Sequence, residues 1–155
     1  MRAGFYEWEV TPPLGGFMWG HYTEIHAKDV LDRLYIKAAV VEDAGEYAAI
    51  VAVDSCSLIP GIHKIVTDRI AKFCPIPAEN VCISSNHSHS GAPISDDPSC
   101  GGEADQAYLD VFLRLCADAV VLALSFSSVV SVSIVFTAPF ACFNISSVVI
   151  LFHLC

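Results

Sequence analysis

The sequence predicts an α/β fold, in which a mixed β-sheet contains a β-α-β unit and is flanked by helices. Three observations support this prediction. Strand-like runs occur early in the chain, apolar side chains recur at helical spacing over residues 62–73, and an apolar run at residues 81–84 follows directly. A strand, a helix and a second strand in this order form a β-α-β unit when the two strands are parallel.

The amino-terminal part of the chain predicts a strand, a loop and a hairpin. Residues 2–10 alternate apolar and polar side chains and run into a Thr-Pro-Pro turn. Residues 14–32 are rich in glycine and aromatic residues and show no period, so we expect a long loop. Residues 34–42 and 47–53 flank a short polar segment that contains glycine, which predicts a hairpin. The second of these runs is apolar throughout, as is typical of a strand covered on both faces.

Two helices are expected after the hairpin. Pro60 opens the first helix, and Pro75 and Pro77 end it before the strand at residues 81–84. The second helix is expected from about Glu103. Its apolar stripe is typical of a helix that packs on a core, and it comprises Leu109, Phe112, Leu113, Cys116 and Val120.

Charge divides the chain into two parts. The 155 residues carry a formal net charge of −9, and no basic cluster is present to neutralise phosphates, which argues against a nucleic-acid partner. Every Asp, Glu, Lys and Arg lies at or before Asp118. We therefore expect residues 1–118 to form an acidic domain and residues 119–155 to form a hydrophobic tail.

The hydrophobic tail has two interpretations. Residues 119–138 provide about 20 uncharged positions, enough for a helix to span a membrane, so residues 119–154 are expected to contact a membrane. However, no Lys or Arg flanks this segment to orient it. Most of its residues can also be encoded with a pyrimidine in the middle codon position, which is typical of translated noncoding or read-through sequence.

The cysteines do not indicate a disulfide framework. The chain has seven of them, an odd number, and no CxxC pair. Cys56 and Cys82 lie in or beside apolar strands, so we expect them to be buried as small hydrophobic side chains in a reducing compartment. No signal peptide is apparent before the first strand, so a cytoplasmic location is expected for residues 1–118.

The most informative motif is a pair of histidines, His87 and His89, which follows the strand at residues 81–84. On an extended backbone, side chains at i and i+2 point to the same side. Neutral imidazole is a common zinc ligand, and the carboxyl end of a strand is where open α/β sheets bind their ligands. Two exposed histidines before a turn also need no function. His21 and His26, in the aromatic loop, are alternative ligands.

Asp54 ends the neighbouring strand, so it should emerge at the same edge of the sheet as His87. A carboxylate there can accept the outer ring N–H of a ligand histidine and thereby fix its tautomer. Alternatively, Asp54 caps the helix that begins near Pro60. The sequence leaves both interpretations open.

The histidine motif also resembles a known family signature. Residues 87–93 read HSHSGAP, which is similar to the His-Thr-His-Ser-Gly-Pro signature of neutral/alkaline, non-lysosomal ceramidases. Three further segments resemble that family in the same order, and together the four cover roughly residues 2–118. They are residues 9–15 (EVTPPLG), 30–43 (VLDRLYIKAAVVED) and 50–54 (IVAVD).

This resemblance implies the amino-terminal part of an incomplete catalytic domain. The family hydrolyses the amide of N-acyl sphingosine with one zinc ion, so the implied partner is a lipid amide. The resemblance assigns a metal ligand to His87 and a place near the metal-bound water or substrate to His89. A second histidine, a glutamate and a tyrosine later in the family's chain would complete the site, so we expect this chain to be inactive alone. The alternatives are a non-catalytic membrane-associated fragment and a different His-x-His metallohydrolase.

Overall fold

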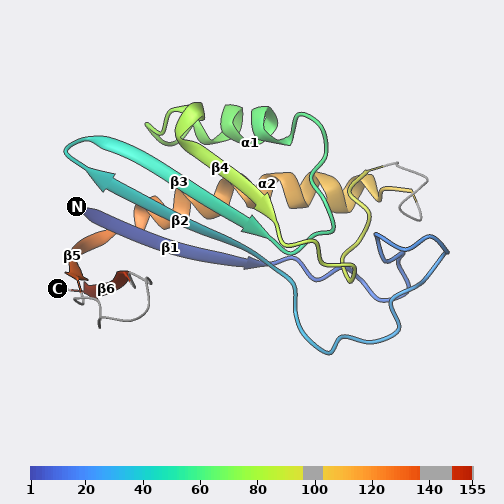
Figure 1. Ribbon diagram of the computed structural model, residues 1–155. Helices are drawn as coiled ribbons and strands as arrows, with labels where there is room; N and C mark the ends of the chain where they lie inside the picture. Colours follow the sequence, from blue (N-terminus) through green and yellow to red (C-terminus); the bar gives the residue numbers. More distant parts are fainter. Residues whose placement is uncertain (96–102, 137–147, 155) are drawn as a thin grey trace.

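The computed structural model describes residues 1–95, 103–136 and 148–154. Within these residues, one sheet has the strand order β4-β3-β2-β1-β5-β6, and two α-helices and a short 3-10 helix accompany it (Figure 1). The strands are β1 (Arg2–Glu9), β2 (Tyr35–Asp43), β3 (Glu46–Val53), β4 (Val81–Ser85), β5 (Ser128–Phe136) and β6 (Val148–Leu154). The helices are α1 (Ile62–Ile70), η1 (Ala78–Asn80) and α2 (Gln106–Ser125).

The predicted α/β fold with a mixed sheet is confirmed. Strands β1, β2 and β3 pair in antiparallel fashion, whereas β3 and β4 are parallel and are connected through α1, so they form the expected β-α-β unit. The β2–β3 hairpin turns at Ala44 and Gly45, whose φ angles of 52° and 88° are both left-handed. Left-handed conformations at both central residues are typical of tight hairpin turns.

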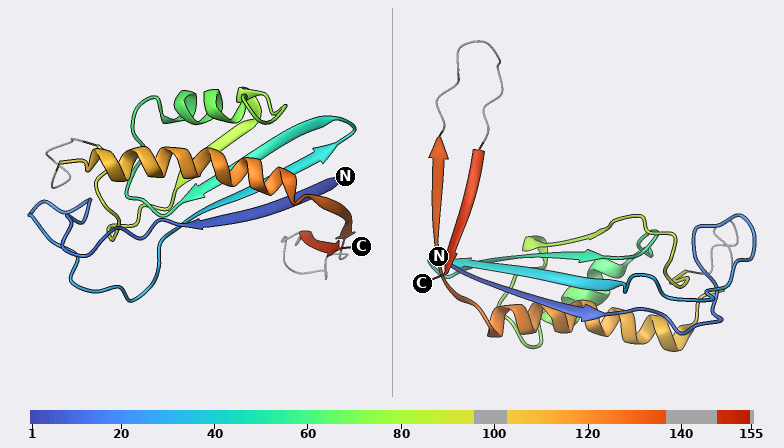
Figure 2. Two further views of the ribbon diagram at one scale, coloured as in Figure 1. Left: turned by 180° about the vertical axis from the view of Figure 1, so that it is seen from behind. Right: turned by 90° about the horizontal axis from the view of Figure 1, so that it is seen from below.

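Both helices lie on the same face of the sheet, as the view from below shows (Figure 2). Side chains alternate along each strand, so every second residue points toward the helices. In β2 and β3 these residues include Ile36, Val40 and Val51, each no more than 1% exposed. Phe112 of α2 and Val66 of α1 pack against them in the same core.

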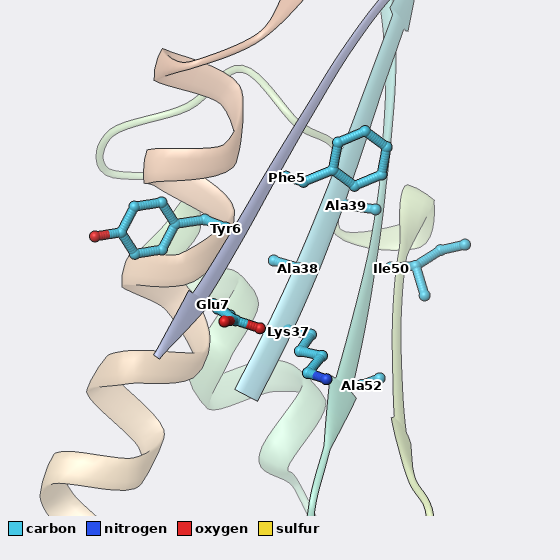
Figure 3. Close-up of a pocket in the computed structure, with 8 residues that line it drawn as sticks. All are labelled: Phe5, Tyr6, Glu7, Lys37, Ala38, Ala39, Ile50 and Ala52. Carbon is cyan, nitrogen blue, oxygen red and sulfur yellow. The ribbon is translucent and has the colours of Figure 1, made fainter. Parts of the chain in front are cut away.

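The opposite face of the sheet is exposed and partly apolar. Phe5, Ala39 and Ile50 lie in one row because their positions are paired across β1, β2 and β3. Phe5 is 61% exposed and Ile50 is 58% exposed. Figure 3 shows them beside a hollow of about 540 Å³, whose rim includes Lys37.

Two sequence predictions are wrong on this face. Strand β3 was expected to be covered on both sides, but Ile50 and Ala52 are exposed. Cys82 was expected to be buried, but it is paired with Ile50 and shares its exposed row. The apolar run in β3 therefore reflects its alanine-rich composition rather than two covering layers.

We expect this exposed row to promote self-association, because contiguous apolar surface drives contacts between molecules. The double variant Phe5→Thr, Ile50→Thr should bind less hydrophobic dye and scatter less light than the parent chain. The matched control is Ile65→Thr, Phe73→Thr, which changes the same residue types at exposed positions in and just after α1. Equal decreases in the two double variants would show that the sheet face has no special role.

Helix α2 begins close to its predicted start. The carboxylate of Asp105 accepts hydrogen bonds from the backbone N–H groups of Ala107 at 2.9 Å and Tyr108 at 3.2 Å, which is typical of a helix N-cap. The helix then continues through Asp118 and ends at Ser125. The proposed division at residue 118 therefore falls inside a helix, and that division stays a prediction.

The end of α2 packs on the sheet as part of the core. Ala119, Val120 and Ala123 are each 0% exposed. Residues 119–136 do not form one helix, since α2 gives way to β5 (Ser128–Phe136). Over the part of the chain that the structure describes, no helix has both the length and the apolar character needed to span a membrane. Strand β5 is paired with β1 at two positions, and β5 and β6 pair in antiparallel fashion and extend away from β1–β4 (Figure 2).

Candidate metal site

The candidate site lies at the end of the sheet where β1, β3 and β4 finish (Figure 1). The segment after β4 meets the long aromatic loop there, as the carboxyl-edge argument predicted. The backbone N–H of Trp19, which is 2% exposed, donates to the carbonyl of Gly91 at 2.8 Å. This contact fixes the aromatic loop against the histidine motif.

The two histidines come together through a turn rather than through strand alternation. Strand β4 ends at Ser85, and His87 has a left-handed φ of 62°. The sequence predicted an extended backbone at this point, and that prediction is wrong. The side chain of Asn86 accepts a hydrogen bond from the backbone N–H of Ser88 at 3.2 Å and supports this turn. The imidazole rings nevertheless meet edge to face, with centroids 4.7 Å apart.

The hydrogen bond of His87 defines which nitrogen is available to a metal. Its Nδ1 lies 2.6 Å from the main-chain carbonyl oxygen of Cys56, so Nδ1–H is the donor. In neutral imidazole the other nitrogen, Nε2, then carries the lone pair. This Nε2 accepts a hydrogen bond from Nε2–H of His89 at 3.2 Å, in the place where a metal ion would bind.

Cys56, His87 and His89 form a group that can hold a metal ion. Their ligand atoms all lie within 4.8 Å of one another, and the thiol is buried while His87 is exposed. Zinc binds imidazole nitrogen at about 2.0–2.1 Å in tetrahedral sites, which places two nitrogens on one ion roughly 3.3 Å apart. The observed spacing of the two Nε2 atoms, 3.2 Å, fits this geometry.

Asp54 lies at the expected edge of the sheet but makes different contacts from those predicted. Its carboxylate accepts hydrogen bonds from the backbone N–H of Tyr35 at 2.7 Å and from the side chain of Asn86 at 2.6 Å. The N–H of His87 goes to the Cys56 carbonyl instead. Nor does Asp54 cap α1, because Gly61 precedes that helix and no side chain caps it. Asp54 therefore positions the residue before His87 rather than the imidazole itself.

The alternative histidine ligands lie outside the cluster. His21 donates from Nε2 to the main-chain carbonyl of His89 at 3.1 Å, so it fixes the backbone of His89 rather than joining the ligand atoms. His26 binds Glu24, and this hydrogen bond raises the pKa of His26 above its usual value. The other ring nitrogen of His26, Nδ1, lies 2.8 Å from the carbonyl of Gly15, so both of its nitrogens have partners outside the cluster.

Sequence reasoning did not include Cys56 in the site. The signal was available, because Cys56 follows β3 by three residues and β3 is the parallel neighbour of β4. The same argument, that residues after neighbouring parallel strands meet at one edge of the sheet, applies to Cys56 as it did to Asp54.

Gly20 is a second residue that contributes to the site. A Cβ atom there would lie 2.7 Å from Nδ1 of His89 and 2.8 Å from the Cys56 sulfur.

The fold and the cluster together define an α/β domain with a candidate metal site at the carboxyl edge of its sheet. Neither a protein-family model nor a curated protein matches the sequence. Among solved structures, the fold is similar to neutral ceramidase from Pseudomonas aeruginosa, with a TM-score of 0.73 and 20% identity over 84% of this chain. It is also similar to a structure described as ceramidase complexed with C2, with a TM-score of 0.69 and 18% identity over the same share.

This chain spans 22% of the length of each of these ceramidase chains. The resemblance that the sequence motifs indicated is therefore confirmed at the level of the fold. The match also agrees with the expectation of an incomplete α/β domain.

Proposed function

We propose that this chain is part of a zinc-dependent amidohydrolase similar to neutral ceramidase. The complete enzyme would hydrolyse the amide of an N-acyl sphingosine to sphingosine and a fatty acid. One observation carries the proposal: the Nε2 atoms of His87 and His89 face each other at 3.2 Å, at the sheet edge of a fold shared with ceramidases.

The donor set favours zinc over the harder divalent cations. Imidazole and thiol groups suit zinc, whereas Mg²⁺ and Ca²⁺ prefer oxygen ligands. When bound, a zinc ion would polarise the amide carbonyl of the substrate and lower the pKa of a water molecule toward neutrality.

The residues of this chain would orient the reacting groups. The Cys56 carbonyl holds the His87 ring so that its Nε2 points into the site. His21 donates a hydrogen bond to the main-chain carbonyl of His89, and the His89 ring would lie beside the bound zinc, as the resemblance implies. Asp54 does not contact the imidazoles directly; its carboxylate accepts a hydrogen bond from the side chain of Asn86, the residue before His87.

A single family ligand cannot sustain catalysis. The resemblance requires a second histidine, a glutamate and a tyrosine in addition to His87, and this chain spans only 22% of the ceramidase length. We therefore propose that the 155-residue chain does not turn over N-acyl sphingosine. Turnover that a chelator abolishes would contradict this, and turnover of an unrelated ester or amide would favour a different metallohydrolase. The cytoplasmic location of residues 1–118 and membrane contact through residues 119–154 stay predictions.

Zinc titration of the purified chain tests the assignment of His87. We expect His87→Ala to lower zinc affinity by at least about tenfold, since weaker changes around metal sites already have effects of that size. His63→Ala is the control, because His63 lies on α1 and binds the carbonyl of Val81, outside the cluster. Isothermal titration calorimetry measures both affinities. Equal losses in the two variants would show that the histidine motif is not the metal site.

A further inference from the structure

The thiol of Cys56 lies close to the two imidazoles, in the group of three donors described above. Cys56 is 5% exposed and follows β3, the strand parallel to β4. Its sulfur is 3.8 Å from Nδ1 of His87, and its own carbonyl is the acceptor for that ring. One residue therefore contributes both the group that orients His87 and a sulfur beside it.

Donor spacing agrees with a shared ion. A tetrahedral zinc with bonds of about 2.3 Å to sulfur and about 2.0–2.1 Å to nitrogen spaces these donors roughly 3.3–3.6 Å apart. In the structure the three donors lie within 4.8 Å of one another. The side chains would therefore have to close at most about 1.2–1.5 Å when the ion binds.

The backbone at Gly20 lies close to both the Cys56 sulfur and the His89 ring. Gly20 has a left-handed φ of 92°, and a Cβ there would lie 2.8 Å from the Cys56 sulfur and 2.7 Å from Nδ1 of His89. No side chain at position 20 separates the two groups. The aromatic loop thus forms a wall against the thiol and the imidazole together.

We propose that Cys56 is a metal ligand, and that with His87 and His89 it forms a Cys-His-His site for zinc within this chain. This ligand set differs from the one that the family resemblance implies, in which His87 is joined by a histidine, a glutamate and a tyrosine. The inference rests on the metal-binding part of the proposed function and not on its catalytic part. Three local donors would allow the 155-residue chain to bind zinc without ligands from elsewhere.

Cobalt(II) reports directly on a bound thiolate, because sulfur ligation gives a charge-transfer band in the near ultraviolet. We expect the full chain to show this band on cobalt titration. Cys56→Ser should lose the band and bind zinc at least about tenfold more weakly. Cys82→Ser is the matched control, since Cys82 is an exposed thiol on the open sheet face, and it should keep the band.

A second measurement needs no variant. Zinc should protect Cys56 from alkylation in the parent chain while Cys82 reacts at an unchanged rate, as followed by peptide mass mapping. This keeps the inference testable even when Cys56→Ser does not fold.

The outcomes separate this inference from the proposed function. Cobalt bound through His87 without a thiolate band, or a band that survives Cys56→Ser, overturns the role of Cys56 alone. A thiolate band that persists in His87→Ala contradicts the assignment of His87 on which the proposed function depends. A chain that binds neither cobalt nor zinc overturns the local three-ligand site.

Discussion

Gly4→Ala is expected to lower the free energy of unfolding by about 3 kcal/mol, the upper end of the usual cost of inserting a methyl group into a packed core. Gly4 lies in β1 on the face that α2 covers, opposite Val40 of β2. A Cβ at this position would overlap the carbonyl oxygen of Ala123 and lie 3.0 Å from Cα of Ser127. These are backbone atoms, so relief requires α2 or β1 to move. Chemical denaturation measures the loss.

The control for this variant is Gly16→Ala. Gly16 lies in the aromatic loop, and a Cβ there would approach the carbonyl of Pro13 no closer than 3.4 Å. We expect its unfolding free energy to stay within about 0.5 kcal/mol of the parent, as for most surface substitutions. The comparison also tests the end of α2. If Gly4→Ala were as stable as Gly16→Ala, residues 119–125 would not pack on β1, and a boundary near residue 118 would gain support.

The strands and helices of this fold could be predicted from local patterns. Which face of each strand the helices cover could not. Alternation in residues 2–10 and the polar turn before residue 47 are local properties, and they placed β1 and the β2–β3 hairpin correctly. Whether Ile50 is covered depends on which face of the sheet both helices occupy, which no strand sequence specifies. Likewise, the apolar end of α2 resembled a separate tail because its packing partner, β1, lies more than 100 residues earlier.

The candidate site shows the same limit. The spacing of His87 and His89 indicated a shared role, and the structure brings their Nε2 atoms together. The left-handed backbone of His87 was not predicted, since only a few per cent of residues other than glycine adopt a positive φ. Cys56 lies 31 positions before His87, and its contact depends on the register of two parallel strands. Topology, rather than any motif, assembles that part of the site.

Gly20→Ala is expected to weaken zinc binding by more than about tenfold, the scale on which neighbours of metal ligands act. The added methyl group would lie 2.8 Å from the Cys56 sulfur and 2.7 Å from Nδ1 of His89, so neither donor could keep its position. The left-handed φ of 92° adds a backbone cost of roughly 1–2 kcal/mol for any residue with a Cβ. The test must therefore separate lost ligand geometry from lost stability.

Gly15→Ala provides that separation, because Gly15 lies in the same loop and has a nearly identical φ of 86°, yet a Cβ there would meet nothing within 4 Å. Both variants incur the backbone cost, so both should unfold at lower denaturant concentration than the parent. Only Gly20→Ala changes the space beside Cys56 and His89, so only that variant should lose zinc affinity in calorimetric titration. If Gly15→Ala lost as much affinity as Gly20→Ala, the effect would come from the loop conformation, and the close contact at Gly20 would not shape the site.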